Sequence, residues 1–325
     1  MLKEYISILI GRIAEKLIYH VPSSLSKNFM EIKGDGLRLI EKSIEENYHK
    51  GWRSEKNYSK EKYKEDLYMH LSGRLENDRR IIIPWLDNAA SLKNKRILEI
   101  GCGTGSSTVA LAEQGAKVTG IDIDEGALAV ARDRCKVYGL KVELQALNAN
   151  RLSGFFGANA FDFIIFFACL EHMTIAERLT SLKDAWKILP TGGLLVIVET
   201  PNRLWYYDGH TSMLPFFHWL PNELAFAYSK FSSRDNFREL YNDYNATSKE
   251  SFLRRGRGMS FHEFDIAIGR TKNLKVISSL STFDRIRHKL QKTKLEQKYE
   301  SILMSIYPNI HEGFFDDNLY LIIEK

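Results

Sequence analysis

The sequence lacks the features that would place it in a membrane or in an oxidising compartment. Its longest uninterrupted apolar run, Phe163–Leu170, has eight residues, whereas a helix that spans a bilayer needs roughly 20. Cysteine occurs at three positions, Cys102, Cys135 and Cys169. This odd number, without metal-ligand spacing, argues against both a disulfide framework and a zinc site. The absence of a signal peptide and the reduced cysteines predict a cytoplasmic protein, with no bound metal.

A strong excess of charge of one sign is also missing. The 325 residues include 46 Lys and Arg against 41 Asp and Glu, a formal net charge of +5. Binding to nucleic acid would need positive charge concentrated on one face, so nucleic acid is not an expected partner. Hydrophobic residues make up 44% of the chain, which is enough to exclude disorder and to fill one large domain or two modest ones.

The first 95 residues have helical rather than alternating spacing. In residues 1–20, apolar side chains recur three and four positions apart among charged ones, which predicts an amphipathic helix and not a signal peptide. Such a helix could pack against its own domain or a partner subunit. It could also lie on a membrane surface, where Lys3, Arg12 and Lys16 would favour anionic lipid. We therefore expect residues 1–95 to form a helical extension with a possible peripheral membrane contact through residues 1–20.

From residue 96 onward, strand and helix patterns alternate. The sequence predicts strands at 96–100, 117–123, 142–146, 161–169, 194–199, 274–279 and 319–323, and helices at 106–114, 125–138, 174–189 and 261–269. This alternation predicts an α/β fold, namely a doubly wound, Rossmann-like, seven-stranded, mostly parallel sheet with helices on both faces. Residues 96–325 would form this domain, with an aromatic cap insertion at about 202–259 and a basic insertion at about 281–317.

A glycine-rich loop follows the first predicted strand. Gly101, Gly103 and Gly105 stand between that strand and a helix, where the backbone must turn sharply and let a ligand approach. Position 106 is Ser, so the loop reads G-x-G-x-G and not the dinucleotide fingerprint. Asp122 ends the second strand, 21 residues after Gly101, where a carboxylate can accept both hydroxyls of a ribose. Together these residues predict a site for an adenosine-containing ligand.

The segments Ile97–Gly105 and Val118–Ile123 resemble the class I S-adenosylmethionine-dependent methyltransferases, and Phe161-Asp162, Leu170–His172 and Leu189–Gly193 follow in the order of that family. The resemblance implies S-adenosylmethionine as the cofactor. It places the three glycines beside its methionine part with Glu99 near the amino group, Asp122 on the ribose and Ile123 against adenine. Asn148 stands where the family often has Asp, with Ala149 next to it; its amide oxygen can still accept from the adenine amino group. Ala168 and Cys169 would face the sulfonium.

His172 lies just past the fourth predicted strand, at the reactive end of that site. An acceptor hydroxyl needs a base, and a histidine pKa lies near neutrality, so His172 is the first candidate. The alternative is a histidine that only orients substrate or supports structure, and Glu171 is another candidate acid. Cys102 and Cys169 are interpreted as small buried fillers.

The cap insertion is expected to select the acceptor. It holds 13 of the 38 aromatic residues within 58 positions, which could form either a lid core or a stacking surface for a sugar or another planar acceptor. The substrate-contact candidates are Arg203, Trp205, His210 and His218, with Arg254, Arg255 and Arg257 as further cations. Short segments at 200–205 and 214–221 resemble methyltransferases of bacterial surface-polysaccharide biosynthesis. The basic run Arg285–Lys298 is interpreted as a solvated helix.

The resulting hypothesis is an S-adenosylmethionine-dependent O-methyltransferase that acts on a hydroxyl of a sugar or glycan. Methylation of a small metabolite, such as a quinone or lipid-linked precursor, is the alternative within the same class. A cofactor-binding interaction module without catalysis is the alternative of another class. The sequence gives no indication of the oligomeric state.

Overall fold

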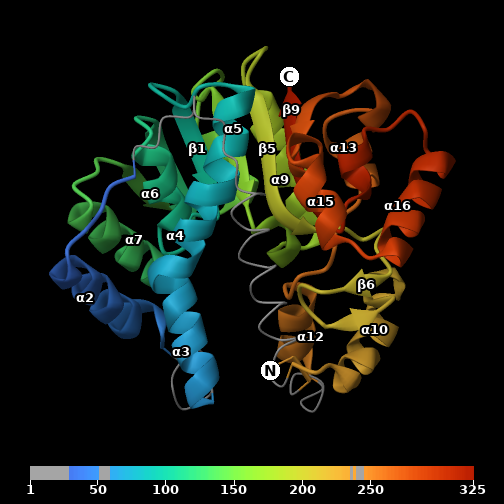
Figure 1. Ribbon diagram of the computed structural model, residues 1–325, viewed down its shortest axis with the longest axis horizontal. Helices are drawn as coiled ribbons and strands as arrows, with labels where there is room; N and C mark the ends of the chain where they lie inside the picture. The colour runs from blue at the N-terminus through green and yellow to red at the C-terminus, as the bar shows by residue number, and fades with distance from the viewer. Residues whose placement is uncertain (1–28, 51–58, 235–236, 239–244) are drawn as a thin grey trace, which may run out of the picture.

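A computed structural model describes residues 29–50, 59–234, 237–238 and 245–325. Its centre is a seven-stranded sheet in the order β3-β2-β1-β4-β5-β9-β8 (Figure 1). The strands are β1 (Arg96–Ile100), β2 (Lys117–Asp122), β3 (Glu143–Ala146), β4 (Phe163–Phe167), β5 (Leu194–Pro201), β8 (Lys275–Ser279) and β9 (Asn318–Glu324). β1 to β5 pair in parallel, and β9 runs antiparallel to both of its neighbours. The doubly wound fold expected from the alternation is confirmed.

Successive residues of a strand point to opposite faces of the sheet. Both faces are buried here, because helices cover each of them. Ile97, Phe163 and Ile165 face one apolar cluster, which includes residues of α6 (Ser106–Ala112) and α7 (Glu125–Val137). Leu98, Ile164 and Phe166 face the other, which includes residues of α9 (Ile175–Ile188) and α13 (Phe261–Ala267). Short α8 (Leu152–Phe155) and the 3₁₀ turn η5 (Ala149–Arg151) pack against α9. This double burial explains the continuous apolar run in β4.

The described part of the N-terminal region joins the first of these clusters. It comprises α2 (Gly34–Ser43), η1 (Ile44–Tyr48) and a helical column that runs without a break from Lys60 to Ala89. The column consists of α3 (Lys60–Tyr68), η3 (Met69–Gly73), α4 (Arg74–Asn77), η4 (Asp78–Ile82) and α5 (Ile83–Ala89), where η3 and η4 are π-helical turns. Trp85 and Leu86 are fully buried beside Val109 and Leu111. These helices are thus part of the domain core, while the helix expected at residues 1–20 lies outside the described residues.

The cap follows β5 and has a small core of its own. It contains the ribbon β6 (Tyr207–Asp208) and β7 (Leu214–Pro215), η7 (Phe217–Trp219), α10 (Asn222–Tyr228), η8 (Ser229–Phe231) and α12 (Ala246–Leu253). Phe217, Phe226, Phe237 and Phe252 pack together in this core. Most of its aromatic residues that are buried therefore serve the cap itself, as the lid-core alternative expects.

The basic insertion is helical and lies between β8 and β9. It forms α14 (Leu280–Phe283), α15 (Arg285–Gln291), α16 (Lys294–Ile306) and then η10 (Glu312–Phe315). A further 3₁₀ turn, η9 (Thr271–Asn273), precedes β8. No residue of α15 or α16 is buried, in agreement with the solvated helix that was expected. Lys292, between the two helices, is the exception: it is enclosed and lies 3.1 Å from Glu300 and 3.4 Å from Asp316.

The carboxyl ends of the parallel strands define the functional edge. The chain ends after β9 at the top of Figure 1, and β9 is antiparallel to β5, so β1 to β5 point downward toward α3 and the cap. None of the described helices has the length and hydropathy that a bilayer-spanning helix requires.

Candidate functional site

The three loop glycines adopt backbone conformations that other residues rarely adopt. Gly101, Gly103 and Gly105 have φ angles of 81°, 50° and 80°. A Cβ on Gly101 would lie 2.6 Å from the Cβ of Cys169, and one on Gly105 would lie 2.9 Å from the Cα of Ala131. A Cβ on Gly103 would meet nothing within 4 Å. The outer glycines therefore let the loop pack against its surroundings, and Gly103 leaves open space that a ligand can approach.

Glu99 lies behind this loop and is fully buried. Its carboxylate accepts hydrogen bonds from the hydroxyls of Ser107 and of Thr108, the latter at 2.6 Å. Burial raises the pKa of Glu99 to about 7, against the lowering effect of these hydroxyls. Glu99 thus holds the first turn of α6 to strand β1, and the expectation that it lies near a ligand amino group stays a prediction.

Asp122 connects the end of β2 with the glycine loop. Its Oδ2 accepts from the Gly103 N–H at 2.8 Å and its Oδ1 from the Asp124 N–H at 2.9 Å. Each carboxylate oxygen has a further lone pair, so both can still accept from a pair of ribose hydroxyls. Ile123, the next residue, exposes 73% of its surface, although a large apolar side chain gains by burial. An open backbone, a carboxylate with spare acceptors and an uncovered apolar side chain together suit an adenosine.

The adenine end of the site is less fully formed by side chains. Asn148 is exposed, and its Oδ1 accepts from the Asn150 N–H at 3.0 Å, which caps η5. The neighbouring Ala149 is buried. The amide oxygen keeps one lone pair for an adenine amino group, so the roles expected of Asn148 and Ala149 stay predictions.

Arg134 supports the loop and was missed by the sequence analysis. This fully buried guanidinium donates to the carbonyl oxygens of Thr104 at 2.8 Å, Leu71 at 2.9 Å, and His70. It therefore ties the glycine loop to the π turn η3 of the N-terminal column. The available signal was helical periodicity, since Arg134 is three and four positions from the buried Ala131 and Val130.

The reactive end of the site is formed where β4 ends. Ala168 has a φ of 45°, an unusual value for a residue other than glycine, and its N–H donates to the carbonyl of Val198. Cys169 contacts the carbonyl oxygen of Ile100 at 3.3 Å through its sulfur. Burial raises the pKa values of the Cys102 and Cys169 thiols well above their usual range, so both are neutral and agree with the filler interpretation.

His172 follows on a short 3₁₀ turn, η6 (Leu170–His172). Its side chain is 56% exposed, and its Nδ1 lies 3.0 Å from the carbonyl oxygen of Arg254. Because a carbonyl oxygen can only accept, Nδ1 carries a proton, and Nε2 of the neutral ring has a free lone pair. The orientation of the ring is consistent with a base that acts through Nε2.

Glu171 lies beside this Nε2 atom. Its side chain is fully buried, its Oε1 is 3.7 Å from His172 Nε2, and neither carboxylate oxygen has a hydrogen-bond partner among the described residues. Burial raises the pKa of Glu171 to about 7. If His172 takes up a proton, its positive ring lies beside Glu171, and the two opposite charges stabilise the ionised form of the Glu171 carboxyl group.

His210 and His218 occupy different environments. Burial, and next the charge of His172, lower the pKa of the half-buried His210 to about 4, and its Nδ1 lies 2.9 Å from the Thr211 hydroxyl. His218 is buried; its Nδ1 accepts from the Gly258 N–H at 3.1 Å and its Nε2 lies 3.4 Å from Asp208. Asp208 also accepts from three backbone N–H groups of its own loop. His218 therefore fastens the cap, and the substrate contact expected of it stays a prediction.

Trp205 is also part of the core. It is 3% exposed, its indole N–H donates to the Phe315 carbonyl at 2.7 Å, and the Lys292 ammonium lies 4.8 Å from its ring centre. The ring is thus enclosed by its neighbours, and the substrate contact expected of Trp205 stays a prediction. Arg203, two residues earlier, is exposed and stays a candidate.

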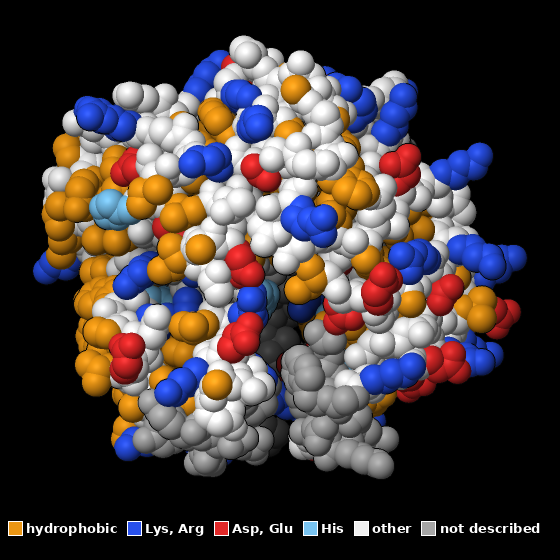
Figure 2. Space-filling view, turned by 180° about the vertical axis from the view of Figure 1, so that it is seen from behind, with side chains coloured by type: hydrophobic (Ala, Val, Ile, Leu, Met, Phe, Trp, Pro, Cys, Tyr) orange, Lys and Arg blue, Asp and Glu red, His pale blue; other side chains and the backbone are white. Residues whose placement is uncertain are grey.

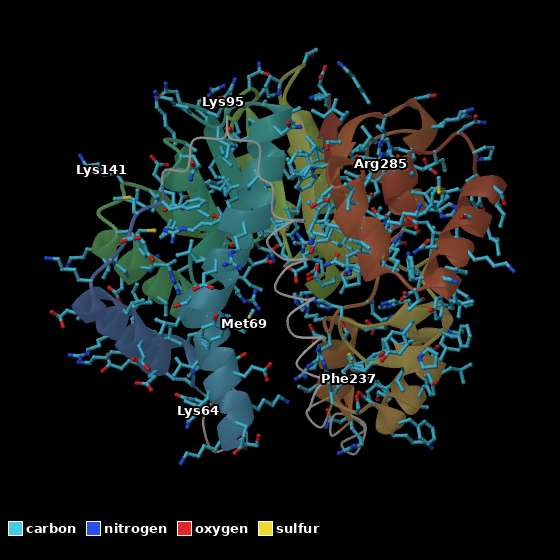
Figure 3. The ribbon with its side chains drawn as sticks, in the orientation of Figure 1. Lys64, Met69, Lys95, Lys141, Phe237 and Arg285 are labelled. Carbon is cyan, nitrogen blue, oxygen red and sulfur yellow. The ribbon has the colours of Figure 1, made fainter. Side chains whose placement is uncertain are left out.

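These elements surround a hollow in the molecular surface. Figure 2 shows it on one face of the molecule, with histidine atoms on its inner wall. In Figure 3, Met69 on η3 lies toward one side and Phe237 of the cap toward the other, whereas Lys95 marks the opposite edge of the sheet. The cap and the N-terminal column thus flank the carboxyl edge of the sheet.

Comparison with known proteins agrees with this geometry. Residues 97–193 match the family model described as "Methyltransferase domain". The chain is 42% identical over 121 residues to a ubiquinone biosynthesis O-methyltransferase of Nitrosococcus oceani, and 33% identical over 121 residues to one of Pseudomonas aeruginosa. Each match covers 37% of this chain, which spans about half the length of the curated relatives it matches. A solved S-adenosylmethionine-dependent methyltransferase of Methanosarcina mazei is 33% identical over 36% of this chain and 57% of its own, with a TM-score of 0.34.

Proposed function

We propose that this chain, whose residues 97–193 match a methyltransferase domain, is a class I S-adenosylmethionine-dependent enzyme that methylates an acceptor hydroxyl, in the first place on a sugar or glycan. The observation that carries the proposal is the pair formed by Glu171 and the exposed His172 at the carboxyl end of β4, beside the glycine loop. Bound S-adenosylmethionine supplies an electrophilic methyl group on a sulfonium.

The chain's contribution to cofactor binding would come from three kinds of contact. The open backbone at Gly103 admits the ligand, the Asp122 carboxylate accepts from ribose hydroxyls, and Ile123 covers one face of the adenine. Since methyl transfer needs nucleophile, carbon and sulfur in line, holding the cofactor firmly at this edge is itself a large part of catalysis.

The proton of the acceptor hydroxyl is the second requirement. We expect Nε2 of His172 to take it, because the Arg254 carbonyl fixes the proton of the neutral ring on Nδ1. The imidazolium formed would then lie 3.7 Å from the Glu171 carboxyl group, whose negative form stabilises it. A positioned base of this kind contributes typically about 10²–10⁴ in rate.

The acceptor class depends on the cap, where the half-buried His210 and the exposed Arg203 are the substrate candidates that the fold leaves accessible. A second candidate acceptor is the phenolic hydroxyl of a quinone precursor. It is favoured by the names of the curated relatives, which are ubiquinone biosynthesis O-methyltransferases.

The test is a methyl-transfer assay with an acceptor panel of neutral sugars, acidic sugars and catechol-type phenols, each product being identified by mass spectrometry. The proposal expects a methylated sugar, formed by the wild type and by a Cys135→Ser control but not by His172→Ala. A methylated phenol alone would transfer the proposal to the second candidate. Cofactor binding without any methylated product would contradict catalysis and favour an interaction module.

A further inference from the structure

A cavity of about 350 Å³ opens next to the cap, and none of the candidate cofactor-binding residues lines it. The start of α9, the segment after β5, the cap and the start of α13 form its walls. One side is apolar, formed by Ile175, Leu204 and Trp219. Ile175 and Trp219 are 51% and 45% exposed, so uncovered apolar surface is available to a ligand.

The same cavity is lined by a buried hydrogen-bond acceptor, Glu263. Glu263 is 8% exposed, and its Oε1 lies 3.1 Å from the buried guanidinium of Arg178. Its Oε2 is buried and has no hydrogen-bond partner among the described residues. A buried acceptor without a donor is unfavourable, and a hydroxyl group of a ligand in the cavity would satisfy it.

Arg203 supplies positive charge at the same cavity. Arg178 is used by Glu263 and by backbone carbonyls, and Arg257 donates to the carbonyls of Phe217 and Leu220. The Arg203 side chain, in contrast, forms no hydrogen bond or ion pair with a described residue, although it lines the cavity. Burial, and next the charges of Arg203 and Arg178, lower the pKa of Arg257 to about 10. Asp208 also acts on Arg257, and Glu171 and Glu263 act on Arg178, so Arg203 is the lining cation that no carboxylate engages in an ion pair among the described residues.

The walls therefore combine an aromatic ring, a hydroxyl acceptor and an unpaired cation. An aromatic surface suits the apolar face of a sugar ring, and carboxylate and guanidinium groups suit its hydroxyl edge. The Arg203 guanidinium favours a ring that also carries a carboxylate or a phosphate. His262, exposed and stacked on Phe261 at 4.1 Å between ring centres, adds a further polar contact.

From this juxtaposition we propose that the cavity is a subsite for an anionic sugar ring, with its charged group on Arg203, a hydroxyl on Glu263 Oε2 and its apolar face on Trp219. The subsite rests on the proposed function, in that it would hold a non-reacting sugar unit of the acceptor. The segment 254–260 connects the cavity with the pair Glu171 and His172. The Arg254 carbonyl lies against His172, the Gly256 N–H donates to the Glu171 carbonyl, and Ser260 lines the cavity.

The test is a titration of the full chain with glucuronate and with glucose as a matched neutral ring, followed by calorimetry or ligand-observed NMR. Glucuronate should bind about tenfold more tightly than glucose. Arg203→Ala should remove this preference, whereas Arg270→Ala, which changes an exposed arginine that does not line the cavity, should keep it. Trp219→Ala should weaken both sugars severalfold, in contrast to its control Phe231→Ala, an exposed cap aromatic.

Glu263→Gln should weaken both sugars as well, and its unfolding midpoint shows whether the variant folds without the Arg178 ion pair. If it does not fold, Arg203→Ala and Trp219→Ala decide the question. Equal affinities for glucuronate and glucose, or unchanged affinities in Arg203→Ala, would overturn the subsite. Sugar binding that depends on Arg203, in a protein that methylates only phenols, would support the subsite and refute the sugar acceptor.

Discussion

Replacing Gly101 and Gly103 by alanine separates the two tasks of the glycine loop. Both positions have positive φ, so either change costs about 1–2 kcal/mol of backbone energy. Only at Gly101 does the new methyl group meet its neighbours, with the Cβ of Cys169 at 2.6 Å and the carbonyl oxygen of Phe167 at 2.9 Å. Neither atom is the end of a flexible side chain, so overpacking adds about 1–3 kcal/mol.

We therefore expect Gly101→Ala to lose about 2–5 kcal/mol of unfolding free energy, and Gly103→Ala only about 1–2 kcal/mol. Gly103→Ala should instead bind S-adenosylhomocysteine at least about tenfold more weakly, because its methyl group occupies space that is open to the ligand. Urea unfolding of both variants and calorimetric titration of Gly103→Ala measure the two effects. Equal stability losses, or wild-type affinity in Gly103→Ala, would refute this division of roles.

Three further changes test the support of the site. Asp122→Ala removes an acceptor for two ribose hydroxyls and the partner of the Gly103 N–H, so cofactor affinity should fall about 100-fold or more by calorimetry; unchanged affinity would exclude the ribose contact. Arg134→Met removes the three hydrogen bonds that tie the glycine loop to the N-terminal column and should lower the unfolding free energy by about 3 kcal/mol; an unchanged urea midpoint would show that these bonds do not stabilise the fold. The folded state holds a proton on Glu171 up to about pH 7, whereas the unfolded chain releases it near pH 4.5. The wild type should therefore lose roughly 3 kcal/mol of unfolding free energy as the pH rises between these values, and Glu171→Gln should not show this loss. Equal pH dependence in variant and wild type would disprove the raised pKa.

The sheet and the cofactor edge could be predicted because their signals are local in sequence. β4 is apolar at every position because both faces are covered, and Gly101 to Gly105 follow β1 directly. The family resemblance then placed Asp122 in a segment whose backbone is fixed by strand pairing with β1 and β3. In such segments, residue type and position already determine which side chain reaches the carboxyl edge.

The cap could not be predicted in the same way, because the burial of its side chains depends on contacts distant in sequence. Trp205 is enclosed by Phe315 and Lys292, and His218 by Gly258. A tryptophan or histidine in a loop looks the same in the sequence whether it faces a ligand or the core.

The same reasoning explains the residues that were missed. Glu263 was missed because it is 60 positions from the candidate Arg203 in the chain, and the two line one cavity only because α13 packs beside the segment that follows β5. Arg134 is an ordinary charged position in a helix until the N-terminal column brings the carbonyls of His70 and Leu71 to it. Side chains that connect separate elements carry no periodic signal of their own.

The most direct test of hydroxyl methylation by this site is a single-turnover reaction with methyl-labelled S-adenosylmethionine and the best acceptor of the panel. The product position is read by NMR, and wild type is compared with His172→Ala. The labelled methyl group should appear on a hydroxyl oxygen, and the variant should react about 10²–10⁴ times more slowly with unchanged cofactor affinity. A label on nitrogen or carbon, or full turnover without His172, would contradict the account.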